Sequence, residues 1–244
     1  MSREAGIGPR YHEASKYART DMSGLTTWAR PVPPYKEYAE PLSAVELPAP
    51  SPSGGLPLWQ AIALRRSVRE FRPESLSLEQ LAQLLWAIQG VTAEFGQHAL
   101  RSCASAGALY PNETYLFVNR VEGCPSGIWH YQVRERRLAQ LAEGNFGRDL
   151  AQACLGQEFC ATAAAVFAWG AVADRCAWKY GDRAFRYIYM DAGHLGAHLQ
   201  LACVALGLGS VNIGAFYDDE VNALLALDGH AETVVYLTAV GHPA

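Results

Sequence analysis

The chain has 244 residues, half of them hydrophobic, which is enough to bury a full core. Its formal net charge is -4, and its arginines are scattered among acidic residues, so it offers no basic face for nucleic acid. No stretch is as long and uncharged as a membrane span requires, and the charged, glycine-containing start of the chain is unlike a secretory signal. We therefore expect a cytoplasmic protein.

The six cysteines include no C-x-x-C pair and do not cluster with histidines at metal-ligand spacing. This pattern argues against zinc sites, iron–sulfur clusters and a disulfide framework. We expect no metal and mostly buried, free thiols.

The first 55 residues are rich in proline, tyrosine and serine. Seven prolines between positions 31 and 52 exclude a long helix there. This composition predicts an extended arm over residues 1–55 that docks on a surface through its aromatic side chains, with disorder as the competing interpretation. A globular domain is then expected over residues 56–244.

In the globular part, a helix is predicted from Pro57 to about Arg66, and a capping box of Ser77 and Gln80 opens a second helix, which Gly90 ends. Residues 114–120 and 128–133 are predicted to form a hairpin. A further helix is expected over 145–155, and the apolar run 163–172 predicts a central strand that is covered on both faces.

The longest predicted helix runs from about residue 183 to residue 206, and Gly207 stands where a left-handed cap belongs. Its small residues at 192–193 and 196–197 permit the close approach of another helix, including one from a second subunit. Strands are expected over 211–213 and 233–240, separated by a short helix that Asp218 caps. Because the hairpin rules out a purely parallel sheet, the expected fold class is α+β, with helices flanking the sheet.

Three segments carry candidate chemistry. Arg65, Arg66 and Arg69 with the Ser67 hydroxyl suit a phosphate, although the same residues also suit a helix C-terminus that offsets its own dipole. The run of small residues over 101–111 admits a flat ligand, as it would also suit a tight surface loop.

The third segment is 209–216, where a predicted strand ends in a turn of small residues. The bare backbone at Gly214 and Ala215 could lie against an isoalloxazine ring and donate a hydrogen bond to flavin N5. A core strand that turns into a helix is the alternative. Together, the arginines and this turn predict the two ends of a flavin mononucleotide (FMN) site.

The order of five motifs along the chain resembles the nitroreductase family and, within it, the azoline-oxidising dehydrogenases that modify ribosomally made peptides. The motifs are R-R-S-x-R at 65–69, S-A-G-A-L-Y-P at 105–111, R-Y with A-G-H at 186–187 and 192–194, N-I-G-A-F at 212–216, and A-V-G-H-P at 239–243. The arm, through Y-H-E-A at 11–14 and P-Y-K-E-Y at 34–38, is similar to that branch as well.

The resemblance implies a mostly antiparallel sheet flanked by helices, and a homodimer with FMN at the subunit interface. The implied FMN contacts are Arg65, Arg66, Ser67 and Arg69 around the phosphate, with Arg69 nearer the ring; Ser105, Ala106 and Ala108 from the opposite subunit; and Asn212, Ile213, Gly214 and Ala215 along the ring edge. Many relatives add basic residues from a C-terminal tail. This sequence stops just past its last predicted strand, so we expect the arginines near residue 65 to carry more of the phosphate charge.

Lys179-Tyr180-Gly181 matches the lysine–tyrosine pair that this branch is thought to use for proton abstraction. Aromatising a thiazoline or oxazoline removes one carbon-bound proton and one hydride, and FMN would take the hydride. The base would be Tyr180, with its pKa lowered by Lys179, or a neutral Lys179 itself. Without the resemblance, this dipeptide would be an ordinary loop or helix start.

The first hypothesis is therefore an FMN-dependent dehydrogenase that oxidises azoline heterocycles of a peptide to azoles, with oxygen as the electron acceptor and a cyclodehydratase as a partner. The second is an NAD(P)H-dependent reductase of nitro compounds or quinones, which are small-molecule substrates. The third is a flavin-free dimer that serves as a scaffold in a peptide-modifying complex. The Lys179-Tyr180 pair and the arm favour the first.

Overall fold

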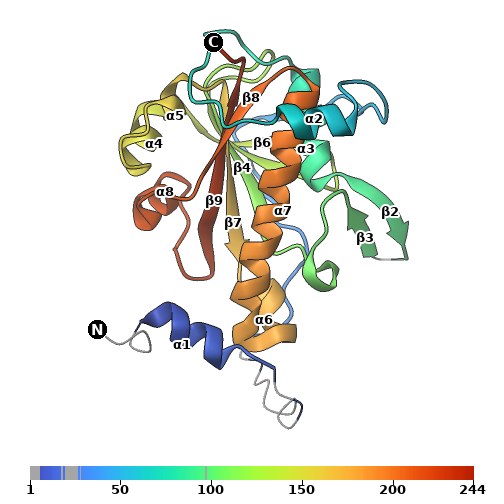
Figure 1. Ribbon diagram of the computed structural model, residues 1–244, viewed down its shortest axis with the longest axis vertical. Coiled ribbons are helices and arrows are strands. Elements are labelled where there is room, and N and C mark those ends of the chain that lie inside the picture. The colour runs from blue at the N-terminus through green and yellow to red at the C-terminus, as the bar shows by residue number, and fades with distance from the viewer. Residues whose placement is uncertain (1–5, 18, 20–26, 28, 97) are drawn as a thin grey trace.

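In a computed structural model that describes residues 6–17, 19, 27, 29–96 and 98–244, seven strands form one sheet in the order β1-β6-β5-β4-β7-β9-β8 (Figure 1). Every neighbouring pair is antiparallel. The strands are β1 Ala44–Glu46, β4 Asn112–Val118, β5 Gly127–Gln132, β6 Arg137–Glu143, β7 Ala165–Val172, β8 Gly209–Ile213 and β9 Glu232–Gly241. A separate hairpin consists of β2 Val91–Phe95 and β3 His98–Arg101.

Helices cover both faces of the sheet. The α-helices are α1 Ile7–Ala14, α2 Leu58–Leu64, α3 Leu78–Gln89, α4 Gly147–Ala153, α5 Phe159–Thr162, α6 Asp174–Tyr180, α7 Ala184–Ala205 and α8 Asp218–Leu224. Two short 3-10 turns, η2 Ala106–Ala108 and η3 Gly181–Arg183, complete the described elements. α3 and α7 lie on one face, and α4, α5 and α8 lie on the other (Figure 1). No helix in the described ranges is both long enough and apolar enough to cross a membrane.

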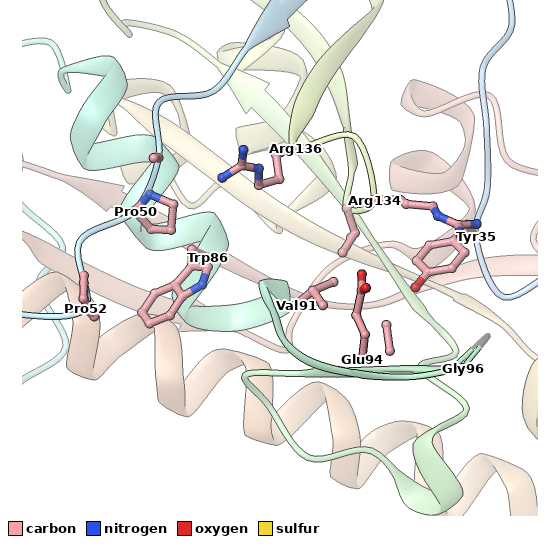
Figure 2. Close-up of a pocket in the computed structure, with 12 residues that line it drawn as sticks. Tyr35, Pro50, Pro52, Trp86, Val91, Glu94, Gly96, Arg134 and Arg136 are labelled. Atoms are coloured by element: carbon pink, nitrogen blue, oxygen red, sulfur yellow. The ribbon is translucent and has the colours of Figure 1, made fainter.

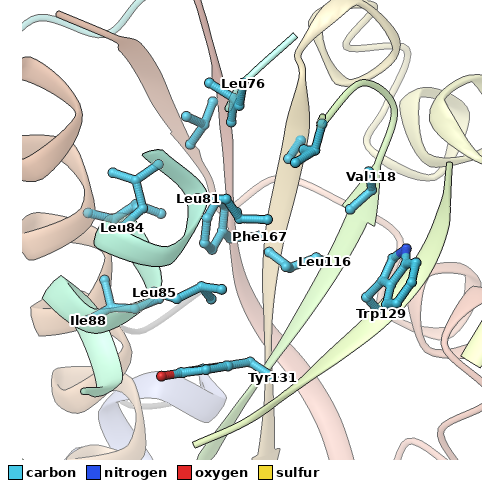
Figure 3. Close-up of a cluster of buried hydrophobic side chains, with 14 of the residues drawn as sticks. Leu76, Leu81, Leu84, Leu85, Ile88, Leu116, Val118, Trp129, Tyr131 and Phe167 are labelled. Carbon is cyan, nitrogen blue, oxygen red and sulfur yellow. The ribbon is translucent and has the colours of Figure 1, made fainter. Parts of the chain in front are cut away.

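The central strand β4 is buried along its whole length because its side chains alternate between two cores. Leu116 and Val118 join the core under α3 and α7, whereas Tyr115 and Phe117 join the core under α4 and α8. Figure 3 shows the first core, where α3 contributes a stripe at helical spacing, namely Leu81, Leu84, Leu85 and Ile88.

Most of the predicted elements are confirmed. Ser77 and Gln80 form both hydrogen bonds of the capping box, β4 and β5 form the hairpin, and β7 is a central strand. Gly207 ends the long helix with a φ of 73°. All six cysteines are buried thiols. The predicted cap at Asp218 is wrong: Asp218 is the first helical residue after Tyr217, and no side chain caps α8.

The arm departs from a uniformly extended chain at its start, and it also contributes a strand to the main sheet. Residues 7–14 form α1, since the prolines that exclude a helix come later in the arm and Pro9 falls in the first turn, where no backbone N–H is needed. Residues 44–46 form β1, which pairs with β6 and so belongs to the main sheet. At the opposite edge, Ser67 forms a parallel bridge with Ser210 of β8.

Candidate active site

The arginine-rich segment 65–69 lies directly against the start of β8. Ser67 bridges Ser210, and the backbone N–H of Val68 donates to the Ser210 carbonyl at 3.0 Å. A Cβ at position 209 would lie 2.8 Å from Cγ1 of Val68, so the close approach requires Gly209. The fold therefore brings the first and third predicted segments together.

The basic side chains of this segment differ in whether they form hydrogen bonds within the chain. Arg66 donates to the carbonyls of Ala63 and Arg65, at 3.1 and 2.7 Å, and so closes the end of α2, as the helix-terminus interpretation expected. In the described parts of the chain, no hydrogen bond or ion pair engages the side chains of Arg65, Ser67 or Arg69. These three groups are therefore the ones available to an anion.

The other end of this region is the turn after β8. Gly214 and Ala215 are exposed, and a Cβ at position 214 would meet only Cε2 of Tyr236, at 3.8 Å. Asn212 is positioned by Thr238, whose hydroxyl donates to Oδ1 at 2.7 Å. Gly214 lies four positions after Ser210, which is about 13 Å along an extended chain. The residues present thus fit an elongated molecule with an anionic group at one end and a flat group at the other, as FMN has.

A second region centres on the loop over residues 105–110. Three of its residues have left-handed backbone, with φ values of 63° at Gly107, 54° at Ala108 and 46° at Tyr110. Alanine and tyrosine adopt this conformation at a cost of roughly 1–2 kcal/mol each. Such strain persists only where surrounding contacts impose it, and it concentrates at functional sites.

Asp191 of α7 supplies one of those contacts. Its side chain is 5% exposed and accepts hydrogen bonds from Ser105 Oγ at 2.6 Å and from Ala106 N at 3.2 Å. Burial raises the pKa of Asp191, while these hydrogen bonds act in the opposite direction. Ser105 Oγ in turn accepts from the Tyr110 N–H at 2.9 Å, so one carboxylate organises both ends of the loop.

Lys179 and Tyr180, at the end of α6, pack onto this loop. A Cβ at position 107 would lie 2.5 Å from the Tyr180 hydroxyl and 2.8 Å from Lys179 Nζ. Lys179 Nζ lies 5.3 Å from the centre of the Tyr180 ring, and that ring packs edge-on against Tyr187 at 4.8 Å. The hydroxyl and the amine therefore converge on a backbone position where no side chain intervenes.

A buried ionic cluster anchors α6 to the sheet and to the arm. Arg175 Nη1 contacts Glu113 at 2.5 Å, and its Nε donates to the Pro33 carbonyl at 2.7 Å. The second oxygen of Glu113 lies 2.9 Å from His130 Nε2. Burial alone would raise the pKa of Glu113, but the hydrogen bond with His130 and the charge of Arg175 lower it to about 2.

The two regions lie on different flanks of α7. Gly196 faces Asn212, since a Cβ there would lie 3.0 Å from Nδ2, whereas Asp191 faces Ser105. Five helical residues correspond to a rotation of about 140° around the helix. α7 also spans about 33 Å, with α6 at its first residue and α2 packed near its last. One copy of the chain therefore does not bring the arginines to Lys179 and Tyr180.

Sequence reasoning missed Asp191 and Gly107 as parts of the site. A signal for Asp191 was present, because an acidic residue between Ile188 and Leu195 interrupts the buried stripe of α7. No local pattern shows that Gly107 will meet residues 179 and 180, since that contact depends on the tertiary fold.

The chain matches the nitroreductase family over residues 62–242. MJ1384 of Methanocaldococcus jannaschii, provisionally named a nitroreductase, is 38% identical over 170 residues, which cover 70% of this chain and 84% of that protein. The trifolitoxin-processing protein TfxB of Rhizobium leguminosarum bv. trifolii is 26% identical over 173 residues, covering 67% of this chain and 46% of TfxB.

Solved structures share the fold. A provisionally named nitroreductase of Anabaena variabilis has a TM-score of 0.65 at 34% identity, covering 77% of this chain and 38% of that chain. A chain of the E. coli microcin synthetase McbBCD complex with truncated pro-MccB17 bound has a TM-score of 0.65 at 19% identity. The match covers 97% of this chain and 87% of that chain. A provisionally named nitroreductase of Desulfovibrio desulfuricans in complex with FMN has a TM-score of 0.55 at 20% identity, covering 78% of this chain and 86% of that chain. This chain thus spans less than half of TfxB and of the Anabaena protein.

Proposed function

This chain belongs to the nitroreductase family of flavin-dependent oxidoreductases, and from that premise we propose that it is an FMN-dependent dehydrogenase that oxidises azoline heterocycles in peptides to azoles. The observation that carries the proposal is the convergence of Lys179 Nζ and the Tyr180 hydroxyl on Gly107. A reductase of nitro compounds needs no base at a substrate carbon, whereas aromatisation of an azoline does.

FMN is the cofactor of the proposal. Arg65, Ser67 and Arg69 would hold its phosphate, because their side chains are free of other partners in the described parts of the chain and lie beside β8. Gly214 and Ala215 would leave room for the ring, with Asn212 and Ile213 behind them. The complex of the Desulfovibrio relative with FMN supports this assignment.

The chemistry divides between the cofactor and the chain. When bound, FMN supplies a hydride acceptor. Tyr180 or Lys179 would take the proton from the ring carbon, so that the azoline loses one proton and one hydride and becomes an azole. Asp191 would be a positioning residue, because its carboxylate holds the strained 105–110 loop against which both groups pack.

We propose further that the working enzyme is a homodimer. Nitroreductases are commonly dimeric, and here the arginine segment and the loop with Lys179 and Tyr180 lie on different flanks of α7. A second copy would bring Ser105, Ala106 and Ala108 to the FMN held by the first. The exposed apolar residues on α2 and α7 provide surface for such a contact, and Trp59 is 78% exposed.

Two relatives support a peptide substrate. TfxB is a trifolitoxin-processing protein, and the McbBCD chain with the same fold comes from a microcin synthetase complex with truncated pro-MccB17 bound. We infer that a cyclodehydratase partner forms the azoline, because the chain needs a preformed ring from which to remove hydrogens.

The test is mass spectrometry of a thiazoline-containing peptide after incubation with the FMN-loaded protein in air. We expect a loss of two hydrogens per ring. An unchanged mass, together with rapid bleaching of the flavin absorbance by NADH or NADPH, would favour the nitro or quinone reductase instead. A protein that stays colourless after incubation with FMN and dialysis would favour the scaffold.

Gly107→Ala is expected to abolish dehydrogenation. The new methyl group would overlap the Tyr180 hydroxyl and Lys179 Nζ, and the left-handed φ would add roughly 1–2 kcal/mol of strain. Gly123→Ala is the matched control, because Gly123 has a φ of 70° but nothing within 4 Å of its added Cβ. Thermal unfolding should show a loss of stability from backbone strain in both variants, and a larger loss in Gly107→Ala, where the methyl group also overlaps its neighbours. Equal dehydrogenation rates in the two variants would show that the Gly107 contact is irrelevant to catalysis.

A further inference from the structure

A groove runs between the arm, the β2–β3 hairpin and the turn that joins β5 to β6. Its central hollow, of about 570 Å³, is lined by Tyr35, Pro50 and Pro52 from the arm, by Trp86 of α3, and by the turn residues Arg134 and Arg136 (Figure 2). Hollows of about 430 and 360 Å³ adjoin it, one through Tyr35 and Arg134 and the other through Pro52 and Trp86. The three together form one elongated groove, the arm groove.

From these features we infer that the arm groove binds an extended segment of the peptide substrate whose central residues are acidic. This rests on the proposed function in one respect, namely that the substrate is a peptide. An extended chain suits the elongated shape, and the half-buried Trp86 ring, which lines two of the hollows, suits an apolar side chain.

The charges of the groove favour acidic residues at its centre. The central hollow carries two arginines, Arg134 and Arg136, against one carboxylate, Glu94. Each outer hollow carries a single carboxylate, Glu37 in one and Glu79 in the other. No ion pair involves Arg134 or Arg136 among the described residues, and both side chains are exposed.

The backbone at Arg136 supports a binding role for its side chain. Arg136 has a φ of 53°, in the left-handed region where glycine or asparagine would fit with less strain. An arginine at such a position stabilises the turn less well than glycine would. A strained residue that lines a groove is typical of a functional contact.

Side-chain contacts through the buried Arg101 connect the groove with the candidate active site. β3 ends at Arg101, whose guanidinium lies over the Tyr35 ring at 5.0 Å and over the Tyr110 ring at 4.5 Å. The Arg101 N–H donates to the Tyr110 hydroxyl at 2.9 Å. Tyr110 belongs to the 105–110 loop, so these contacts join Tyr35, which lines the groove, to the loop against which Lys179 and Tyr180 pack.

The test uses fluorescence anisotropy of the FMN-loaded protein with two fluorescein-labelled decapeptides that are identical except for three central residues, glutamate in one and lysine in the other. We expect only the glutamate peptide to bind, with a dissociation constant that rises with salt concentration. Arg134→Ala and Arg136→Gly should each weaken binding about fivefold, and Arg136→Gly should leave the thermal midpoint unchanged or higher.

Dehydrogenation of a short thiazoline substrate without the acidic segment separates this inference from the proposed function. Both variants should retain it, since the arginines do not touch Lys179, Tyr180 or the 105–110 loop. Equal binding of the two peptides, or binding unaffected by either variant, would overturn the inference while leaving the dehydrogenase assignment intact. Variants that instead change the oligomeric state in light scattering would assign the groove to a second copy of the chain.

Discussion

Tyr180→Phe is expected to lower the rate of dehydrogenation by about a hundredfold to ten-thousandfold, with FMN binding unchanged. The substitution removes only the hydroxyl that packs against Gly107, and the ring keeps its edge contact with Tyr187. Stopped-flow absorbance of the flavin during a single turnover measures the rate. Tyr131→Phe is the matched control, because the Tyr131 ring lies in the core beneath α3 (Figure 3).

Lys179→Ala shows which group is the base. If Tyr180 takes the proton, Lys179→Ala should keep more activity than Tyr180→Phe, because the hydroxyl that reacts is still present. If Lys179 takes the proton, Lys179→Ala should be the less active of the two variants. Wild-type rates in both Tyr180→Phe and Lys179→Ala would remove this pair from the mechanism.

Glu113→Gln is expected to lower the free energy of unfolding by about 3–5 kcal/mol at neutral pH. Glutamine keeps the shape of the side chain but leaves Arg175, which is 4% exposed, without its counter-charge. Urea unfolding measures the loss. Glu122→Gln removes an exposed carboxylate from a turn, and it should change the stability by less than about 0.5 kcal/mol.

The same substitution should change how stability depends on pH. A carboxyl group whose pKa is lower in the folded protein stabilises it above the unfolded pKa, and the contribution disappears as the pH falls through the folded pKa. For Glu113 this window extends from about 4.5 to about 2, and the contribution is about 3 kcal/mol. The wild type should lose this increment on acidification, whereas Glu113→Gln should not. Parallel stability curves for the two proteins would contradict the role of the cluster.

Much of the fold could be predicted from local patterns. The capping box at Ser77, the apolar stripe of α3 and the left-handed cap at Gly207 depend on residues within a few positions of one another, and all three are confirmed. β1 escaped prediction because three residues carry no periodic pattern, and its pairing with β6 depends on chain about 90 residues away.

The candidate site was predicted only in part, for the same reason. The basic segment and the turn after β8 are visible as residue types, and the fold brings them together through Ser67 and Ser210. The supporting groups are not visible in this way. Asp191 meets Ser105 across 86 residues, and Arg175 meets the arm at Pro33 across 142 residues, so only the tertiary structure reveals them.

The pairing of β1 with β6 has a consequence for the solubility of shortened forms of the chain. A fragment beginning at residue 56 would leave the backbone amide and carbonyl groups of Arg137–Gln140 in β6 unpaired at the edge of the sheet. An unpaired edge strand pairs with strands of other molecules and so promotes aggregation. With the arm in place, the edge strand of the sheet is β1. This strand has only three residues and includes Glu46, so it is too short and too charged to pair with another molecule. The arm thus protects the molecule from self-aggregation as well as lining its groove.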